Sequence, residues 1–308
     1  MKHNTVLLEE SIEALNIKSE GIYVDCTLGG GGHSERILES LSVNGKLIAI
    51  DQDSFAINKS KERLAAYENV IFVKDNFSNI KNILKDLQIE KVDGVLLDLG
   101  VSSFQFDDRE RGFSYWDEAA LDMRMDQDAR IDAKFIINNY TQNELTRVFN
   151  DYGEEKNAYR FAKAIVKARY HQPLITNKDL VETIKGSLSE KEKRKPGHPA
   201  RKIFQALRIE VNQEMKVLEN VLPAILEILN PGGRVAVITF HSIEDRIVKQ
   251  FFKKMEKPCE CPSDFPVCTC GKVPLLKIIG KKPIEPKAEE LEDNSRARSS
   301  KLRIAEKI

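Results

Sequence analysis

Apolar and polar positions alternate in a regular way along the first third of the chain. Short apolar runs typical of buried strands occupy residues 21–27, 45–53, 69–77 and 92–103. The segments between them, at 33–41, 54–67 and 79–87, repeat their apolar positions at helical spacing. Buried strands that alternate with amphipathic helices predict a parallel sheet with helices on both faces.

The pattern changes between residues 106 and 202, where no convincing apolar strand run occurs. This part of the chain is charged and helix-like, for example at 157–170 and 177–188. It is therefore predicted to be a helical insertion. The predicted domains are a first part of the core at 1–105, the insertion at 106–202 and a second part of the core at 203–308.

The alternation of helices and strands resumes after the insertion. The sequence predicts a long helix over 208–229, a turn at 230–233, a strand at 234–240 and a helix at 242–255. Ser242 and Asp245 have the spacing of a capping box at the start of the last helix. The runs 274–279 and 299–308 predict closing strands, which often run antiparallel at the edge of such a sheet.

Charge is distributed unevenly along the 308 residues, although the formal net charge is zero. Residues 107–132 carry a local net charge of −5, and residues 191–202 carry one of +5. A neutral total can therefore hide a basic patch that meets phosphate. No segment approaches the roughly 18 apolar residues of a membrane span, and the N-terminal residues do not resemble a signal peptide. We expect a cytoplasmic protein without a membrane segment.

Candidate ligand-binding residues lie at the predicted carboxyl ends of the strands, where open α/β sheets bind their ligands. They are the glycine loop Gly29–Gly32, Asp51, the segment Asp75–Phe77 and Asp98. Glycines let the backbone turn sharply and approach a ligand closely. Asp51 alone could cap a helix or accept the hydroxyls of a ribose. The four features together, each at a strand end, predict a nucleoside site.

The glycine loop narrows the choice of nucleoside. The phosphate loop of an NTPase ends in Gly-Lys-Ser/Thr, which does not follow here. The dinucleotide fingerprint needs a third glycine at a position that Ser34 or Glu35 occupies in this chain. A loop that holds no phosphate, combined with an acid for a ribose, favours S-adenosylmethionine as the ligand.

Several long motifs together resemble one family of enzymes. They include DCTLGGGGHS at 25–34, DGVLLDLGVSSFQFDDRERGFS at 93–114, HPARKIFQALRIEVNQE at 198–214 and NSRARSSKLRIAEK at 294–307. From His3 to about Lys307 the chain resembles the bacterial small-subunit ribosomal RNA methyltransferases called RsmH or MraW. The resemblance implies a Rossmann-like class I S-adenosylmethionine-dependent methyltransferase with an inserted helical domain. It also implies N4-methylation of one cytidine in the decoding region of 16S ribosomal RNA, and it favours the assembled small subunit as substrate.

The resemblance further implies a set of residues that contact the cofactor. These residues are Gly31, Gly32, His33, Asp51, Phe77, Asp98 and Gln105. Most of them agree with the candidates that the strand ends supply. His33 and Gln105 are added by the resemblance, because spacing alone indicates only a helix-start residue and a loop residue.

Methyl transfer from a sulfonium is an in-line displacement, in which an enzyme mainly positions and desolvates the reactants. The cytosine amine is a poor nucleophile, so an acceptor for one of its protons would help. Many amine methyltransferases carry Asp/Asn-Pro-Pro-aromatic after the fourth strand, but this chain reads Asp98-Leu-Gly-Val101. Asp98 and His241 are both candidate acceptors, although His241 could instead only order the end of its strand.

Basic and aromatic residues are candidates for contacts with RNA. Arg201, Arg296 and Arg298 lie in basic segments and are predicted to bind phosphates. The alternative for these segments is a solvated charged loop. The aromatic residues of RGFSYW at 111–116 suit base stacking, but aromatic residues in such a loop more often pack on their own domain.

Four of the five cysteines crowd into the segment CECPSDFPVCTC. They are Cys259, Cys261, Cys268 and Cys270. Four thiolates within so short a segment could bind one zinc ion. The alternative is a reduced, exposed loop, and the family resemblance implies no metal, so none is assigned from the sequence.

Two other functions are compatible with the same predicted sheet. One is a methyltransferase that acts on DNA or on a protein side chain. The other is a nucleotide-binding regulator that performs no chemistry. Turnover on RNA distinguishes them from an RNA methyltransferase, whereas binding of the cofactor alone does not.

Overall fold

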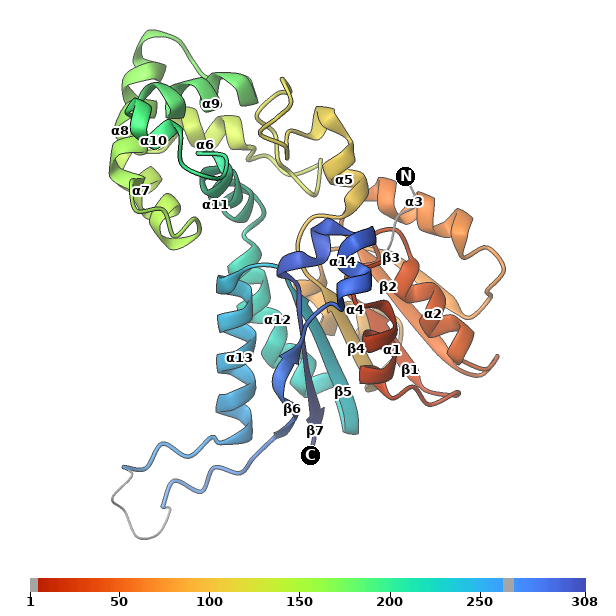
Figure 1. Ribbon diagram of the computed structural model, residues 1–308. Coiled ribbons are helices and arrows are strands. Elements are labelled where there is room, and N and C mark those ends of the chain that lie inside the picture. Colours follow the sequence, from red (N-terminus) through yellow and green to blue (C-terminus); the bar gives the residue numbers. More distant parts are fainter. Residues whose placement is uncertain (1–4, 263–268) are drawn as a thin grey trace. The chain divides into compact units, whose positions relative to one another are not determined.

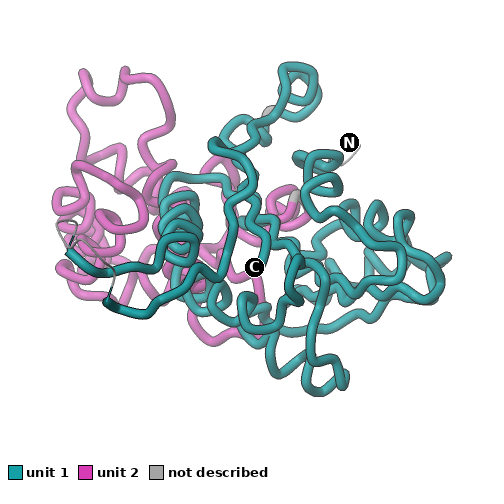
Figure 2. Tube along the Cα trace, turned by 90° about the horizontal axis from the view of Figure 1, so that it is seen from below, with its two compact units in different colours: residues 1–100, 215–308 teal, residues 101–214 magenta. Residues whose placement is uncertain are grey.

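The computed structural model describes residues 5–262 and 269–308 of the chain. The chain divides into two compact units (Figures 1 and 2). Unit 1 comprises residues 1–100 and 215–308, and unit 2 comprises residues 101–214. The polypeptide therefore leaves unit 1 after the first 100 residues, builds unit 2, and returns to complete unit 1.

Unit 1 is built around a sheet of seven strands in the described part of the chain (Figure 1). The strands are β1 (Ile22–Asp25), β2 (Lys46–Asp51), β3 (Val70–Lys74), β4 (Val92–Asp98), β5 (Leu229–Thr239), β6 (Leu276–Ile284) and β7 (Lys301–Lys307). Their order is β3-β2-β1-β4-β5-β7-β6. The pairs among β1 to β5 are parallel, and β7 runs antiparallel to both β5 and β6. The predicted mostly parallel sheet with an antiparallel edge is confirmed.

Helices cover both faces of this sheet. The helices α1 (Leu8–Leu15), α2 (Gly32–Ser40) and α3 (Ser54–Arg63) share one hydrophobic core with the sheet, and α4 (Ile80–Asp86), α12 (Glu214–Ile228) and α13 (Ser242–Glu256) share the other. Along β4, the buried side chains of Val95 and Leu97 belong to the core of α4, α12 and α13, while Leu96 belongs to the opposite core. This alternation explains why the strand is apolar at consecutive positions: both of its faces are buried.

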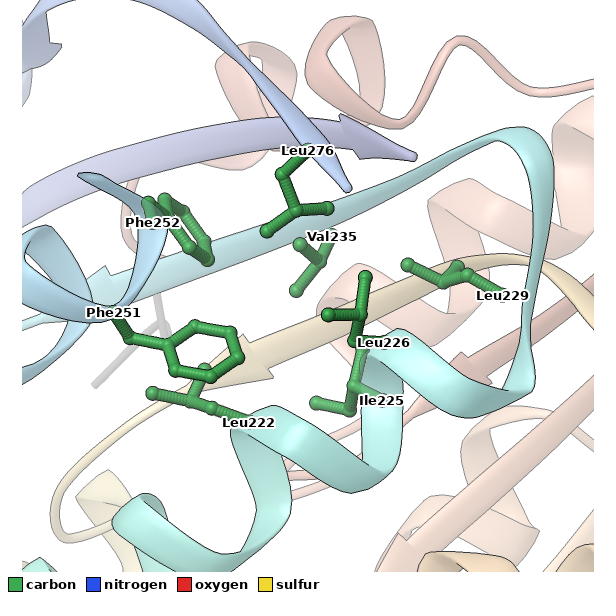
Figure 3. A pocket seen from close by; sticks show the side chains of 8 residues that line it. All are labelled: Leu222, Ile225, Leu226, Leu229, Val235, Phe251, Phe252 and Leu276. Atoms are coloured by element: carbon green, nitrogen blue, oxygen red, sulfur yellow. The ribbon is translucent and has the colours of Figure 1, made fainter. Parts of the chain in front are cut away.

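A small pocket lies between α12, α13 and the sheet (Figure 3). Its lining is wholly aliphatic or aromatic, with Leu222, Phe251 and Phe252 among the side chains, and it is too narrow to admit a water molecule. Leu229, which also lines it, pairs with Val92 at the start of β4. The pocket is therefore a packing gap in the hydrophobic core, and it presents no group that could act on a ligand.

Unit 2 is helical, as the sequence predicts for its central part. Its helices are α5 (Ser103–Asp107), α6 (Ala133–Asn139), α7 (Gln142–Asp151), α8 (Ala158–His171), α9 (Asn177–Gly186), α10 (Glu190–Lys193) and α11 (Arg201–Asn212). The sequence places the start of the insertion at 106 and its end at 202, whereas unit 2 runs from Val101 to Glu214. The difference at the end arises because Ile203, Phe204 and Leu207 of α11 are buried in the core of unit 2.

Two local predictions after unit 2 are wrong. The helix expected over 208–229 is broken at Gln213, which adopts the left-handed conformation with φ +50° and ends α11. The turn expected at 230–233 lies within β5, because Leu229 already pairs with Val92 of β4. The register then shifts between Val92 and Gly94, so the Asn-Pro-Gly-Gly segment forms an irregular start to the strand.

Candidate active site

Three carboxylates lie at one edge of the sheet, where the parallel strands end. We call this the carboxyl edge and the opposite one the amino edge. Asp25, the last residue of β1, pairs with Ala49 of β2 on one side and with Leu96 of β4 on the other. Asp51 and Asp98 end those two neighbouring strands, two residues beyond this level. The strand order reverses here, and such switch points bind ligands in open α/β sheets.

The glycine loop connects β1 to α2 at this edge. Gly31 is the N-terminal cap of α2 and adopts the left-handed conformation with φ +74°, which favours glycine. A Cβ atom on Gly32 would lie 1.9 Å from Oγ1 of Thr5, and one on Gly31 would lie 3.1 Å from Oγ of Ser60. Close contacts with Thr5 and Ser60 of the same chain therefore already require glycine at two of the four positions, Gly31 and Gly32. Their contact with the cofactor stays a prediction.

Asp51 is partly buried and holds the glycine loop in place. Its Oδ2 accepts a hydrogen bond from the amide of Gly29 at 2.9 Å, and its Oδ1 accepts one from the amide of Asp53 at 2.9 Å. Burial raises the pKa of Asp51 to about 6, because the two amide donors and a partial exposure do not offset the desolvation. Each oxygen keeps a second lone pair that can accept a further hydrogen bond.

Asp98 has a buried oxygen without a partner. Its Oδ1 is inaccessible to solvent and makes no hydrogen bond, while its Oδ2 lies 3.7 Å from Nδ1 of His33. Burial raises the pKa of Asp98 well above its usual range, and the charges of Asp25 and Glu244 add to this effect. An unpaired buried acceptor is costly, and a positive charge close to the carboxyl group would offset this cost.

Sequence reasoning missed Asp25 as a residue of this site. The buried Oδ2 of Asp25 accepts a hydrogen bond from the hydroxyl of Ser34 at 2.7 Å, and Oδ1 accepts one from the amide of Thr27 at 3.0 Å. The hydroxyl oxygen of Thr27 in turn accepts a hydrogen bond from the amide of Asp98 at 2.6 Å. Asp25 thus organises the start of the loop and, through Thr27, the end of β4. The signal that the sequence offered was the position of Asp25 at the end of an apolar, strand-like run.

His33 lies inside the protein rather than on the open side of the loop. Its side chain is 4% exposed, and its Nε2 lies 3.1 Å from the carbonyl oxygen of Val6. The other ring nitrogen faces Asp98. With Nε2 donating to the carbonyl of Val6, Nδ1 faces the Asp98 carboxyl group at a distance longer than that of a hydrogen bond.

Phe77 and Gln105 occupy different surroundings. Phe77 begins the short helix η1 (Phe77–Asn79) after β3 and packs partly buried against the core of unit 1. Gln105 belongs to unit 2, where its Oε1 accepts a hydrogen bond from the amide of Ser102 in a capping box at the start of α5. Their roles as cofactor contacts stay predictions.

His241 caps a helix, and the capping box predicted one residue later is wrong. The Nδ1 atom of His241 accepts a hydrogen bond from the amide of Glu244 at 3.4 Å, and Glu244 Oε2 accepts from the amides of Phe240 and His241. The box is therefore formed by His241 and Glu244, not by Ser242 and Asp245. The prediction failed because a histidine ring can replace the usual hydroxyl or carboxylate acceptor at this position.

Arg296 and Arg298 are exposed residues at the carboxyl edge of unit 1. Lys301, the first residue of β7, pairs with Thr239 at the end of β5, because the two strands are antiparallel. The short helix η3 (Ser295–Ser299), which carries both arginines, immediately precedes β7. Arg201 is also exposed, but it begins α11 in unit 2.

The aromatic residues of RGFSYW, all in unit 2, divide into packed and exposed side chains. Phe113 is buried in the helical core, and Tyr115 stacks on His198 with ring centroids 4.5 Å apart. Both therefore pack on their own unit, as expected. Trp116 departs from this expectation, since 74% of its surface is exposed.

Three of the four clustered cysteines come together in the structure. The sulfur atoms of Cys259, Cys261 and Cys270 all lie within 4.8 Å of one another. Cys268, the fourth member predicted for this cluster, lies outside the described residues. The cluster follows α13 and precedes β6, so it does not belong to the carboxyl edge.

The groups at the carboxyl edge fit S-adenosylmethionine in their chemistry. Asp51, which is partly exposed, offers acceptors for ribose hydroxyls. The carboxyl group of Asp98, whose side chain is 25% exposed, offers an acceptor for a cationic or N–H-bearing group. A mostly parallel sheet with an antiparallel strand near one side is characteristic of class I S-adenosylmethionine-dependent methyltransferases, the class to which this protein belongs. The chain belongs to the MraW methylase family, whose model matches residues 1–308.

Individual relatives are similar over their whole length. A ribosomal RNA small subunit methyltransferase H from Clostridium botulinum (strain Loch Maree / Type A3) is 55% identical over 307 residues, which cover 100% of this chain and 99% of the relative. Its counterpart from Brevibacillus brevis is 52% identical, covering 99% and 98% of the two chains. The solved structure of an rRNA methylase from Streptococcus thermophilus aligns with 11% identity and a TM-score of 0.44, covering 100% of this chain and 99% of the other.

Within the described ranges, every helix is too short or too polar to cross a lipid bilayer.

The substitution Asp51→Asn is expected to flatten the pH dependence of stability. Because the pKa of folded Asp51 is about 6, against an ordinary 3.8, the folded chain keeps a proton between about pH 4 and 6 that the unfolded chain has lost. This stabilisation is complete below about pH 4 and disappears as the pH rises through about 6. Its removal should change the difference in unfolding free energy between about pH 4.5 and 7 by about 1–3 kcal/mol, measured by urea unfolding followed by circular dichroism.

The control for this measurement is Asp86→Asn, which removes an exposed carboxylate from the end of α4. This variant is expected to keep the pH dependence of the wild type. If the Asp51→Asn curve runs parallel to the wild-type curve, the raised pKa of Asp51 is refuted.

Proposed function

We propose that this protein transfers a methyl group from S-adenosylmethionine to N4 of a cytidine in the decoding region of 16S ribosomal RNA. The substrate proposed is the assembled small subunit, and the place of action is the cytoplasm. Family membership supports the reaction class. The names of the relatives from Clostridium botulinum and Brevibacillus brevis support ribosomal RNA of the small subunit as substrate. The family resemblance of the motifs supports the cytidine and its position.

The observation that carries the proposal is that Asp51 and Asp98, both partly exposed, adjoin the segment Thr27–Gly29 at the start of the glycine loop. In this proposal Asp51 accepts the ribose hydroxyls, while Gly31, Gly32 and His33 border the methionine end of the cofactor. Phe77 and Gln105 complete the set of cofactor contacts. When bound, S-adenosylmethionine supplies an electrophilic methyl group on a positively charged sulfur. The surrounding side chains position the reactants and exclude water, which is the main task of an enzyme in such a displacement.

Asp98 is the proposed acceptor of the amine proton. Its Oδ1 is enclosed by the protein, but the side chain as a whole is 25% exposed, so the carboxyl group still reaches the open side of this edge. A positive charge bound nearby lowers the pKa of a carboxyl group, so a cationic ligand offsets the burial that raises the pKa of Asp98. His241 is less suited to this role, because its Nδ1 caps α13 and its Nε2 lies 3.1 Å from the buried carboxylate of Glu244.

Arg296 and Arg298 are the proposed phosphate contacts of unit 1. Both are exposed and lie at the carboxyl edge, where the register of β5 and β7 places η3. Arginine binds phosphate through charge and paired N–H donors. Arg201 is the corresponding proposal for unit 2, where it stands exposed at the start of α11. These contacts would orient the RNA, and the flipped cytidine would enter the site.

The proposed reaction predicts a specific product. Incubation with methyl-labelled S-adenosylmethionine should label assembled small subunits faster than protein-free 16S ribosomal RNA, because the decoding region takes its final form only in the subunit. Digestion to nucleosides should recover the label as N4-methylcytidine. The measurement is the labelling rate, combined with chromatography and mass spectrometry of the nucleosides.

Other outcomes of this assay separate the alternatives. Label in DNA or protein but not in RNA would identify another class of methyltransferase. Binding of the cofactor without turnover on any substrate would identify a regulator. Label on another atom or base would refute the proposed cytidine N4 while leaving the methyltransferase class intact.

A second prediction concerns the proton acceptor. Asp98→Asn keeps the shape of the side chain but is a far weaker base, so the single-turnover rate at saturating cofactor should fall by about 10²–10⁴-fold. His241→Asn provides the matched comparison, because asparagine also caps helices well. This variant should retain the rate within about tenfold. The measurements are single-turnover methylation and the Kd of the cofactor for each variant.

Two results would count against Asp98 as the acceptor. If Asp98→Asn weakens cofactor binding but keeps the rate at saturation, Asp98 is a cofactor contact only. If His241→Asn remains folded by circular dichroism and loses the rate instead, the acceptor is His241.

A third prediction concerns the arginines of η3. The double variant Arg296→Ala/Arg298→Ala should bind 16S ribosomal RNA more weakly, and the loss of affinity should not depend on the base sequence of the RNA. Each lost phosphate contact should reduce the slope of log K against log salt by about 1, giving a change of about 2 for the pair. The affinity is measured by filter binding at several salt concentrations.

The matched control removes two positive charges from the amino edge of the same unit. Lys85 and Lys277 are both exposed, at the end of α4 and at the start of β6. Lys85→Ala/Lys277→Ala should leave the salt dependence nearly unchanged. Equal loss of affinity in both double variants would mean that only net charge matters and that η3 is no specific contact.

A further inference from the structure

The segment between α13 and β6 contains a cluster of three thiols that the methyltransferase reaction does not use. Cys259 and Cys261 come from the arm that leaves α13, and Cys270 comes from the arm that enters β6. Their sulfur atoms lie within 4.8 Å of one another. Cys259 is exposed, and the other two are partly buried. The two arms thus bring three soft ligand atoms together at one point.

The spacing of the sulfur atoms suits a tetrahedral metal ion. With Zn–S bonds of about 2.3 Å, tetrahedral coordination places the sulfur atoms about 3.8 Å apart. The upper limit of 4.8 Å on the distances between the three sulfur atoms is compatible with this value. The amide of Thr269 also donates a hydrogen bond to Sγ of Cys261 at 3.4 Å. Donors of this kind stabilise a coordinating thiolate and fix its orientation.

The described parts of this segment, residues 257–262 and 269–275, form few other stabilising contacts. They form neither helix nor strand. The two arms join at the base, where the amide of Leu275 donates to the carbonyl of Met255 at 2.9 Å, and again where Lys272 pairs with Glu260 at 2.5 Å. Val273 is 66% exposed and Leu275 is 42% exposed, so they add little to a hydrophobic core. Segments that cannot bury a core commonly use a metal or disulfide instead.

We propose that Cys259, Cys261 and Cys270 bind one zinc ion that cross-links the two arms of this segment. The site is structural, because its position separates it from the chemistry. Leu276, which begins β6, pairs with Lys307 at the end of β7, and this is the amino edge of the sheet (Figure 1). The proposed methyl-transfer site lies at the carboxyl edge.

The charge beside the cluster is compatible with a zinc ion bound by thiolates. A zinc ion with three thiolate ligands has a net charge of −1. Lys272, whose ammonium group interacts electrostatically with Cys259 and Cys270, supplies a further positive charge beside the cluster.

Metal analysis of the full-length protein tests the proposal directly. Protein expressed without a polyhistidine tag and purified without added zinc should contain about one zinc ion per chain by mass spectrometry of the metal. X-ray absorption should show three or four sulfur neighbours at about 2.3 Å. Protein without zinc, or zinc with nitrogen and oxygen neighbours only, would overturn the proposal.

Variants locate the metal. Cys261→Ser/Cys270→Ser should reduce the zinc content to near zero, whereas Cys26→Ala, which removes a buried cysteine elsewhere in unit 1, should retain it. Zinc retained at the wild-type level in the double variant would refute the site. If the double variant does not fold, cobalt substitution of the wild type decides: a thiolate-to-cobalt charge-transfer band supports the site, and its absence refutes it.

Limited proteolysis tests the structural role of the zinc ion separately. Removal of zinc from the wild type by a chelator should increase proteolytic cleavage between residues 257 and 275, because the cross-link between the arms is lost. The cofactor Kd, which depends on the carboxyl edge, should remain unchanged. If the cleavage pattern does not change when the chelator is added, zinc does not stabilise this segment even if it is bound.

Discussion

The three carboxylates at the ends of β1, β2 and β4, one buried and two partly buried, are the constraint on which the rest of unit 1 depends. Three acidic groups so close to one another are destabilising unless donors or cations surround them. Asp25 is satisfied by Ser34 and Thr27, and Asp51 by two backbone amides. Asp98 keeps an oxygen without a partner. Bringing these three groups together therefore carries an electrostatic cost at this edge, which is largest at Asp98.

The sheet makes this arrangement possible because its two edges carry different functional groups. Cores on both faces hold the strands rigidly, so the residues that end the strands keep their relative positions. The antiparallel β7 begins at the carboxyl edge, so η3, which precedes it, holds Arg296 and Arg298 at this edge. Acidic and basic groups thus share one edge of the sheet. The thiols of the segment before β6 lie at the other edge, where no catalytic demand applies.

The local sequence pattern predicted the strands of the sheet correctly. It did not predict correctly where the neighbouring helices begin and end. Val95, Leu96 and Leu97 form a continuous apolar run because both faces of β4 are buried, and such a run is visible in the sequence. The break of the helix at Gln213 and the cap formed by His241 depend on one backbone conformation and one ring orientation. Neither leaves a pattern in the sequence, since residues of many kinds occupy such positions when tertiary contacts require them.

The sequence by itself determined the order of the elements, the edge that carries the acids and the family, because periodicity and long motifs are properties of the chain. Only the tertiary structure decided how the acids differ. Asp25, Asp51 and Asp98 look alike in the sequence, yet one is fully hydrogen-bonded, one holds the glycine loop and one has a buried oxygen without a partner. The structure also showed that Gly31 and Gly32 leave room for the chain's own Ser60 and Thr5. The physical reason is that burial and hydrogen bonding arise between segments distant in sequence, so they exist only after the chain has folded.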